Sequence, residues 1–250
     1  MNRLAPSALL ALSLLLTTVA GAQLSDDPSI IPTGRTQFEI DFTHTHDRDA
    51  GVRTDSFNAA ALLLTHDLNS RTDLGLGYGG YTHTYNTSRT WGDLTLRAKY
   101  SLRGHDNSAP SPGDTAFALL PYVTLPLKSG GGSDLVLGGL ILPLALTLPA
   151  EWSLVLMTEF DAVADTTDRH RKLQWIESVV LSRPFTEKSS AYFEFYSVLP
   201  FERGTDWQAQ VNLGFYYAFT ADLCLDLGCN FGLTRAAPDL QTFVGLTYLY

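Results

Sequence analysis

The sequence is poor in cysteine, in positive charge and in long hydrophobic runs, and each shortage excludes a class of protein. Its two cysteines exclude a disulfide framework and a cysteine-rich zinc module. It has 17 basic and 26 acidic residues, a net charge of -9, which argues against a nucleic-acid partner. Beyond residue 22 the longest uncharged stretch is residues 135–150, which glycines and prolines interrupt. It is shorter than the roughly 18 to 20 residues that a membrane-spanning helix needs.

The first 22 residues have the features of a secretory signal peptide. Arg3 is the only charged residue before Asp26, and residues 9–16 are apolar. Ala20-Gly21-Ala22 fits the small-x-small rule for signal peptidase, so we expect cleavage before Gln23. A membrane anchor is the alternative interpretation. An exported chain without spanning helices is either a soluble protein or a β-barrel.

Apolar and polar residues alternate with a period of two along the rest of the chain. Leu94, Leu96 and Ala98 share one parity, for example, while Thr95 and Arg97 share the other. Such alternation places the two sets on opposite faces of a strand. Turn-forming residues separate most of the segments that follow this pattern. We predict twelve strands, near residues 35–45, 54–66, 72–83, 92–102, 115–127, 133–147, 152–163, 172–183, 189–199, 206–219, 222–234 and 239–250.

Three features favour a membrane barrel over a soluble β-sandwich. The apolar parity has large side chains along whole strands, the opposite parity is small and polar, and aromatic residues such as Trp91, Trp152 and Trp207 lie near segment ends. We therefore predict an all-β fold, a closed antiparallel transmembrane β-barrel of about 12 strands, over residues 35–250 in the bacterial outer membrane. Residues 23–34 would be a short periplasmic leader. A soluble exported β-sandwich is the least favoured alternative.

The C-terminus resembles the terminal signal that the barrel-assembly machinery recognises in outer-membrane barrels. The residues that indicate it are Phe243, Gly245, Tyr248 and Tyr250, the last of which ends the chain. An ordinary hydrophobic last strand is the alternative.

Counting the crossings predicts which loops share a side. Connections near residues 46–53, 84–91, 128–132, 164–171, 200–205 and 235–238 would face outside, and those near 67–71, 103–114, 148–151, 184–188 and 220–221 would face the periplasm. Residues 103–114 are long for a periplasmic turn, so a miscounted strand is possible there. Pro121, Pro126 and Pro143 cannot donate to a ladder, so we expect a bulge or broken pairing near them.

The chain resembles the transporter-like barrels grouped as the "MetA-pathway of phenol degradation" family. The stretches that match are residues 92–100, 120–126, 192–196 and 226–239. The resemblance implies uptake of small, aromatic or hydrophobic compounds. Cys224 and Cys229 depart from the family pattern. They are five residues apart and therefore point to opposite faces of one strand, Cys224 inward and Cys229 toward lipid, and cannot bridge each other.

The inward parity collects polar residues in which acids outnumber bases, and these are the candidate lining of a solute path. They could line a narrow channel that favours cations, or Arg97 and Lys99 could pair with acids across the lumen and fill a closed barrel. The candidates are Glu39, Asp41, Asp93, Arg97, Lys99, Glu159, Asp161, Glu194, Gln208, Gln210, Asn212, Asp226 and Asn230.

We expect neither catalysis nor a cofactor. No histidine has a serine two residues away, where the same strand face would bring them together, although a pair from two strands stays open. His44, His46 and His83 could form a surface metal site, but solvated histidines are the favoured interpretation. The sequence thus predicts an outer-membrane channel for passive passage of small molecules, with outer-membrane lipids, the assembly machinery and the solute as partners. A closed barrel with a structural or surface-interaction role is the alternative.

Overall fold

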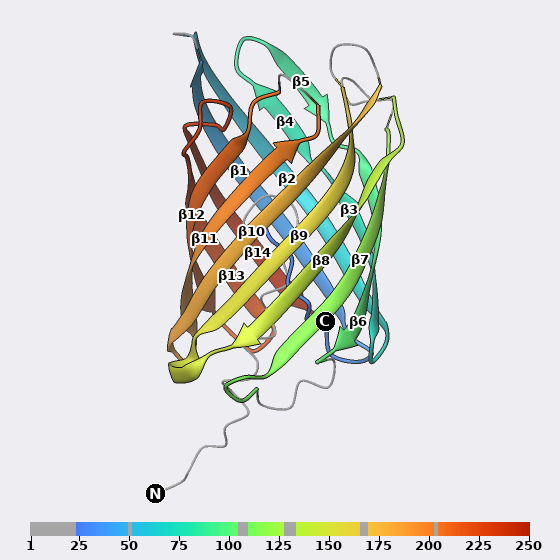
Figure 1. Cartoon of the computed structure of the whole chain (residues 1–250), viewed down its shortest axis with the longest axis vertical. Coiled ribbons are helices and arrows are strands. Elements are labelled where there is room, and N and C mark those ends of the chain that lie inside the picture. The colour runs from blue at the N-terminus through green and yellow to red at the C-terminus, as the bar shows by residue number, and fades with distance from the viewer. Residues whose placement is uncertain (1–23, 50–51, 105–109, 128–133, 166–169, 203–204) are drawn as a thin grey trace, which may run out of the picture.

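The computed structural model describes residues 24–49, 52–104, 110–127, 134–165, 170–202 and 205–250. Most of these residues belong to antiparallel strands (Figure 1). Their bounds are β1 Thr36–Asp49, β2 Val52–Asn69, β3 Thr72–Tyr78, β4 Tyr81–Thr84, β5 Ser88–Trp91, β6 Leu94–Arg103, β7 Thr115–Leu125, β8 Leu137–Thr147, β9 Ser153–Ala164, β10 Arg171–Thr186, β11 Ser189–Pro200, β12 Gln208–Ala218, β13 Leu223–Gly232 and β14 Leu240–Leu249, with one 3-10 turn, η1, at Pro149–Glu151.

The fourteen strand segments form twelve barrel strands, because two of the strands are interrupted. β2 pairs with both β3 and β4, which are separated by Gly79 and Gly80. β4 pairs with β5 and β3 with β6, so β5 and β6 are likewise two parts of one strand. The predicted count of twelve strands is confirmed. The described residues between Arg103 and Thr115 form no further strand.

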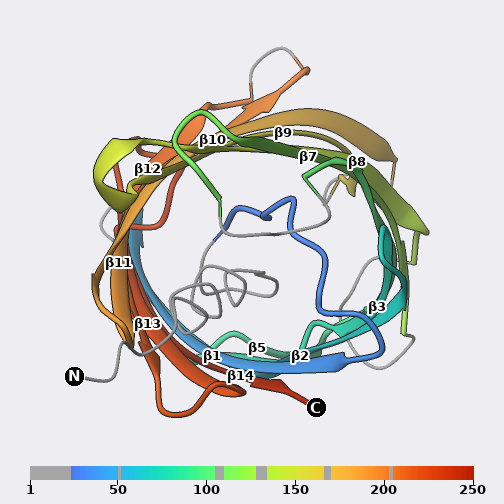
Figure 2. The ribbon, with the colours of Figure 1, turned by 90° about the horizontal axis from the view of Figure 1, so that it is seen from below.

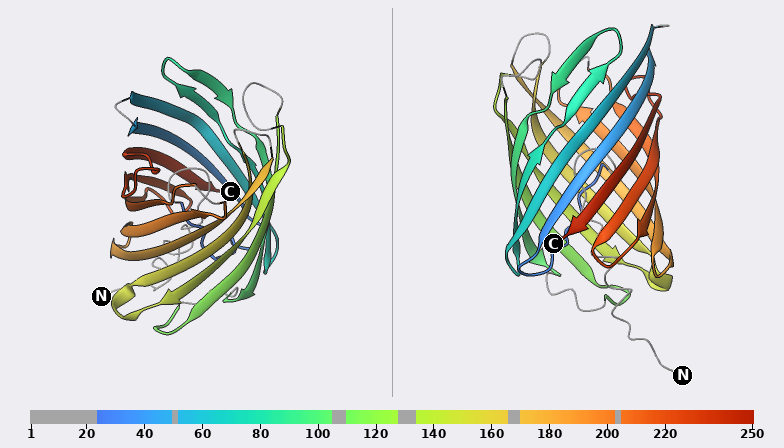
Figure 3. Two further views of the ribbon diagram at one scale, coloured as in Figure 1. Left: turned by 45° about the horizontal axis from the view of Figure 1, so that its top comes forward. Right: turned by 180° about the vertical axis from the view of Figure 1, so that it is seen from behind.

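The sheet closes on itself through its first strand. β1 pairs with β14 on one side and with β2 on the other. Gln37 lies opposite Leu249 in the β1–β14 ladder, and Asp49 lies opposite Val52 in the β1–β2 ladder. The first and last strands lie side by side in the view from behind (Figure 3). Closure matters in lipid because an unpaired strand edge would leave backbone groups without partners.

The barrel is hydrophobic on its outside. In β14, Val244, Leu246 and Tyr248 are 41, 40 and 46% exposed, while Phe243 and Thr247, on the other parity, are buried. The same pattern of exposed large apolar residues recurs around the sheet. A soluble β-sandwich would cover such a surface with a second layer, so that alternative is wrong. No helix within the described ranges is long and apolar enough to cross a membrane.

The predicted disturbance at the prolines is confirmed for two of the three. The β6–β7 ladder lacks pairs between Tyr122 and Leu119, on either side of Pro121. The β7–β8 ladder lacks pairs between Leu144 and Ile141, on either side of Pro143. Pro126 lies just after β7 and therefore outside the ladder.

Three residues of the predicted assembly signal, Phe243, Gly245 and Tyr248, lie on β14, and Tyr250 follows this strand directly. Gly245 faces the interior, where a Cβ atom would overlap the carboxylates of Asp41 and Asp226. The Tyr250 N–H donates to the Thr36 carbonyl at 2.7 Å, which extends the β1–β14 seam to the end of the chain.

Candidate functional site

The interior of the barrel is the candidate functional site, and most of the predicted lining residues are buried in it. Asp93 and Gln210 are partly buried, whereas Gln208, at the start of β12, is exposed. The predicted residues that are buried are Glu39, Asp41, Arg97, Lys99, Glu159, Asp161, Glu194, Asn212, Asp226 and Asn230.

Two further buried acids of the barrel wall, Asp67 and Asp73, were not predicted, and neither were the buried leader acids Asp26 and Asp27. Asp67 was assigned to the turn after the second strand, which in fact continues to Asn69. Asp73 shares the inward parity of Gly75 and Gly77, and that parity was the signal that could have identified it. In the described chain the buried charged residues are ten acids and two bases.

One group of inward residues forms a carboxylate pair on β9. The Tyr122 hydroxyl donates to Asp161 at 2.6 Å and lies 3.3 Å from Glu159. The Gln174 side-chain amide donates to the other Asp161 oxygen at 3.1 Å. Gly139 lies directly beside this group, where a Cβ atom would overlap Asp161. β7, β8, β9 and β10 therefore build one polar surface of the lumen.

A second group surrounds Glu194 on β11, which is fully buried. The Asn212 side-chain amide donates to Glu194 at 2.6 Å. The Ser25 hydroxyl donates to the same carboxylate and is also hydrogen-bonded to the Ser178 hydroxyl. The Leu24 N–H donates to it at 3.4 Å. Two of these donors come from the leader, not from the barrel wall.

The leader enters the barrel, which differs from the expectation of a segment on the periplasmic side. The view along the axis shows it crossing the interior (Figure 2). The Gly34 N–H donates to Asp67 at 2.8 Å and the Ile31 N–H to Asp73 at 3.1 Å. Ser25, Asp26, Asp27, Pro28, Ile30 and Ile31 are buried. These contacts satisfy polar wall groups that would otherwise face an empty lumen.

The two inward bases hold the leader at β6. Both terminal nitrogens of Arg97 donate to the Asp26 carboxylate, at 3.2 and 3.4 Å. The Lys99 ammonium lies 3.9 Å from the same carboxylate and donates to the carbonyls of Asp27 and Ser29 at 2.7 and 3.2 Å. Gly75, opposite Arg97 on β3, leaves room for the Arg97 side chain, because a Cβ atom there would lie 2.6 Å from its Cγ.

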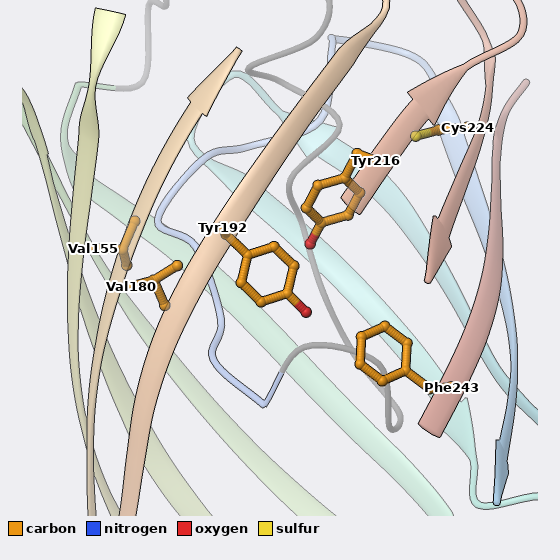
Figure 4. Packing of buried hydrophobic residues seen from close by; sticks show 6 residues of the cluster. All are labelled: Val155, Val180, Tyr192, Tyr216, Cys224 and Phe243. Carbon is orange, nitrogen blue, oxygen red and sulfur yellow. The ribbon is translucent and has the colours of Figure 1, made fainter. Parts of the chain in front are cut away.

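The sequence analysis expected a polar lumen, but part of the lumen is apolar. One apolar cluster comprises Val155, Val180, Tyr192, Tyr216, Cys224 and Phe243 (Figure 4). Another comprises Leu120, Ile141, Met157 and Ile176, with Tyr122, Tyr196 and Val198 packed against it. In residues 154–157 both parities are apolar, and this was the signal that the inner face is partly hydrophobic.

The two cysteines lie on the faces that the sequence predicted for them. Cys224 is buried inside the barrel, Cys229 lies on the opposite face, and both are free thiols. The Nδ1 atom of His46 lies 2.8 Å from the Asp55 carboxylate on the neighbouring strand β2.

The fold and its interior define the class: a closed twelve-stranded antiparallel β-barrel with the outer-membrane barrel fold, whose amphipathic lumen is occupied by its own leader. The model of the family described as "Putative MetA-pathway of phenol degradation" matches residues 21–250, so the chain belongs to this family and the predicted resemblance is confirmed.

Solved outer-membrane barrels have the same fold. An outer membrane channel from Pseudomonas putida F1 is 15% identical, with a TM-score of 0.69, over 91% of this chain and 100% of that one. The KdgM porin in complex with disordered oligogalacturonate is 14% identical, with a TM-score of 0.53, over 84% and 98% of the two chains. The NanC porin is 8% identical, with a TM-score of 0.53, over 86% and 99%. No curated protein sequence matches the chain.

Proposed function

We propose that the protein is an outer-membrane channel through which small molecules, aromatic or otherwise hydrophobic in part, pass passively. The observation that best supports this proposal is which carboxylate pairs with the two buried bases of the lumen, Arg97 and Lys99. In a barrel filled by its own wall, Arg97 and Lys99 would pair with acids across the lumen. Their ion-pair partner is instead Asp26, on a leader that is not part of the wall.

The proposed path follows the predicted inward residues together with the apolar clusters beside them. Glu159 and Asp161 lie next to the cluster around Met157, so one part of the wall offers both carboxylates and apolar surface. A solute with a hydrophobic body and a polar group would find partners for both along this wall. The excess of acids in the lumen favours cations over anions in the bulk ionic current.

The alternative is a closed barrel with a structural or surface-interaction role, in which the leader is a permanent part of the core. Purified wild-type protein and a variant lacking residues 24–31 can be compared in planar bilayers and by liposome swelling. We expect small, cation-selective currents from the wild type and several-fold larger conductance from the deletion variant. No conductance and no swelling in either protein would favour the closed barrel.

The remaining expectations belong to this proposal. Residues 1–22, which lie outside the described residues, direct export, and the last strand recruits the barrel-assembly machinery before lipids surround the apolar outer face. Passage needs no chemical step, so the channel has neither a catalytic group nor a cofactor.

A further inference from the structure

The contact between Asp26 and the bases of β6 has the form of a ligand in a binding site. The carboxylate accepts from two nitrogens of one guanidinium, the geometry that arginine uses for planar anions. The side chains of Arg97, Lys99 and Asp26 are 6, 3 and 9% exposed, so the contact is shielded from bulk water. Arg97 and Lys99 are the only buried basic residues in the ranges that the structure describes.

Among the residues that the structure describes, no carboxylate of the barrel wall forms an ion pair with Arg97 or Lys99. Asp73 is the cross-strand neighbour of Lys99, and with the leader in place its carboxylate accepts the N–H of the leader residue Ile31. Glu39 accepts from the Gln37 side-chain amide at 2.8 Å. The acceptors that Arg97 and Lys99 do use, one carboxylate and two carbonyls, all belong to the leader. If the leader withdraws, Arg97 and Lys99 lose these acceptors and face the lumen, while Asp73 loses the Ile31 N–H and stays beside Lys99 as the wall acid that an incoming carboxylate must compete with.

The surroundings of the site indicate what else a ligand there would touch. The Asp26 N–H lies 3.2 Å from the Met157 sulfur. Met157 belongs to the apolar cluster with Leu120, Ile141 and Ile176. A molecule whose carboxylate replaced that of Asp26 would therefore have its body beside apolar side chains, where an aliphatic or aromatic group buries surface favourably.

We propose that Arg97 and Lys99 form a binding site for small organic carboxylates with a hydrophobic body, and that Asp26 occupies this site as a tethered competitor. The proposal rests on the function proposed above and specifies its solute class. A short tether gives the leader an effective concentration on the order of millimolar. A free carboxylate must therefore reach a similar concentration to displace the wild-type leader. A much lower concentration should suffice once the competing charge of Asp26 is removed.

The test uses benzoate as the probe and benzamide as its neutral isostere. Ionic current is recorded in planar bilayers for the wild type, for Asp26→Asn and for the variant lacking residues 24–31. Asp206→Asn, which removes one exposed acid outside the lumen, is the control for the change in net charge. We expect the concentration of benzoate that halves the current to fall about tenfold or more in Asp26→Asn and in the deletion variant, because a charge-assisted contact no longer competes. Selectivity should also move toward anions in both.

Arg97→Lys, introduced into the Asp26→Asn background, separates a shaped site from a general positive field. Lysine keeps the charge but cannot make the two parallel hydrogen bonds, so the half-blocking concentration of benzoate should rise again. Equal blocking by benzoate and benzamide, or an unchanged benzoate response in both leader variants, would overturn the carboxylate site while leaving the channel intact. Absence of current in every variant would instead reject the channel itself, and the carboxylate site with it.

Discussion

Two inward glycines on one strand provide a direct test of how the lumen is packed. Gly75 and Gly77 are both buried on β3 and both face the interior. A Cβ atom at Gly75 would lie 2.6 Å from the Arg97 Cγ and 3.1 Å from its Cδ. At Gly77 the nearest atom would be the Thr95 Cβ at 3.4 Å, an ordinary contact. The same substitution to alanine should therefore have opposite effects two residues apart.

The magnitudes follow from the packing. Overpacking at Gly75→Ala costs about 1–3 kcal/mol, and replacing an extended glycine by alanine returns roughly 0.5–1 kcal/mol at either position. Gly77→Ala should be neutral or slightly stabilising. The two variants should then differ by about 1–3 kcal/mol, which corresponds to roughly 0.5–1.5 M in the urea midpoint if the slope is about 2 kcal/mol/M.

Unfolding in lipid vesicles, followed by tryptophan fluorescence and by heat-modifiable gel migration, measures this difference. Removing the Arg97 side chain should abolish it, because Gly75→Ala in an Arg97→Ala background meets no Cγ. If Gly75→Ala and Gly77→Ala shift the midpoint equally, or if the penalty persists without the arginine side chain, the proposed packing of Arg97 against Gly75 is wrong.

Three further predictions concern the outer face, the last residue and the thiols. Leu213 lies at the centre of β12 and faces lipid, so Leu213→Arg should destabilise the barrel by about 2–4 kcal/mol in the same vesicle unfolding assay. Leu173 lies near one end of β10, and Leu173→Arg should cost only about 0–1 kcal/mol. Equal costs would contradict the assigned membrane depth. Tyr250→Ser should lower the amount of protein in the outer membrane fraction several-fold with little change in the urea midpoint of the protein that does assemble; a full yield would reject its part in the assembly signal. A membrane-permeant maleimide should label Cys229 faster than the buried Cys224, and oxidation should produce no intramolecular disulfide on gels, so equal labelling would contradict their placement on opposite faces.

The strands could be predicted because each has its own local pattern. In β14 the alternation between Val244, Leu246 and Tyr248 and their polar or small neighbours needs no knowledge of the rest of the chain. Lipid on one side and a lumen on the other impose this pattern along the whole strand. The interruption of the third and fourth strands at Gly79 and Gly92 could not be predicted, because it depends on how two backbones meet. The Gly92 N–H donates to the Gly80 carbonyl at 2.6 Å, and the Gly79 N–H to the Asp93 carbonyl at 3.0 Å.

The composition of the lumen was predicted only in part, because neighbouring strands determine it together. Parity correctly indicated that Glu159 and Asp161 point inward, but it did not indicate that Tyr122 would donate to Asp161 from β7. That contact joins residues 39 positions apart and depends on the register of three strands. The sequence analysis used aromatic residues only as markers of the segment ends, and so it did not predict that Tyr122, Tyr192 and Tyr216 would join apolar clusters in the lumen.

The leader was the largest omission, and it changes how the charges of the lumen should be interpreted. Residues 24–34 have no period, because they form neither strand nor helix, and their hydrogen bonds to the wall reach residues 33 to 170 positions away in the chain. The sequence analysis therefore treated the lumen as a list of acids and bases whose total favours cations. Selectivity depends instead on which charges remain unpaired along the path. The opposite charges of a close ion pair largely cancel each other's field beyond a few ångströms, so a paired charge contributes little to selectivity. With Asp26 bound, the bases of β6 are neutralised and the acids dominate; without it, the same wall presents an anion site beside a carboxylate-rich surface. The leader thus determines which of the two charge patterns a solute meets.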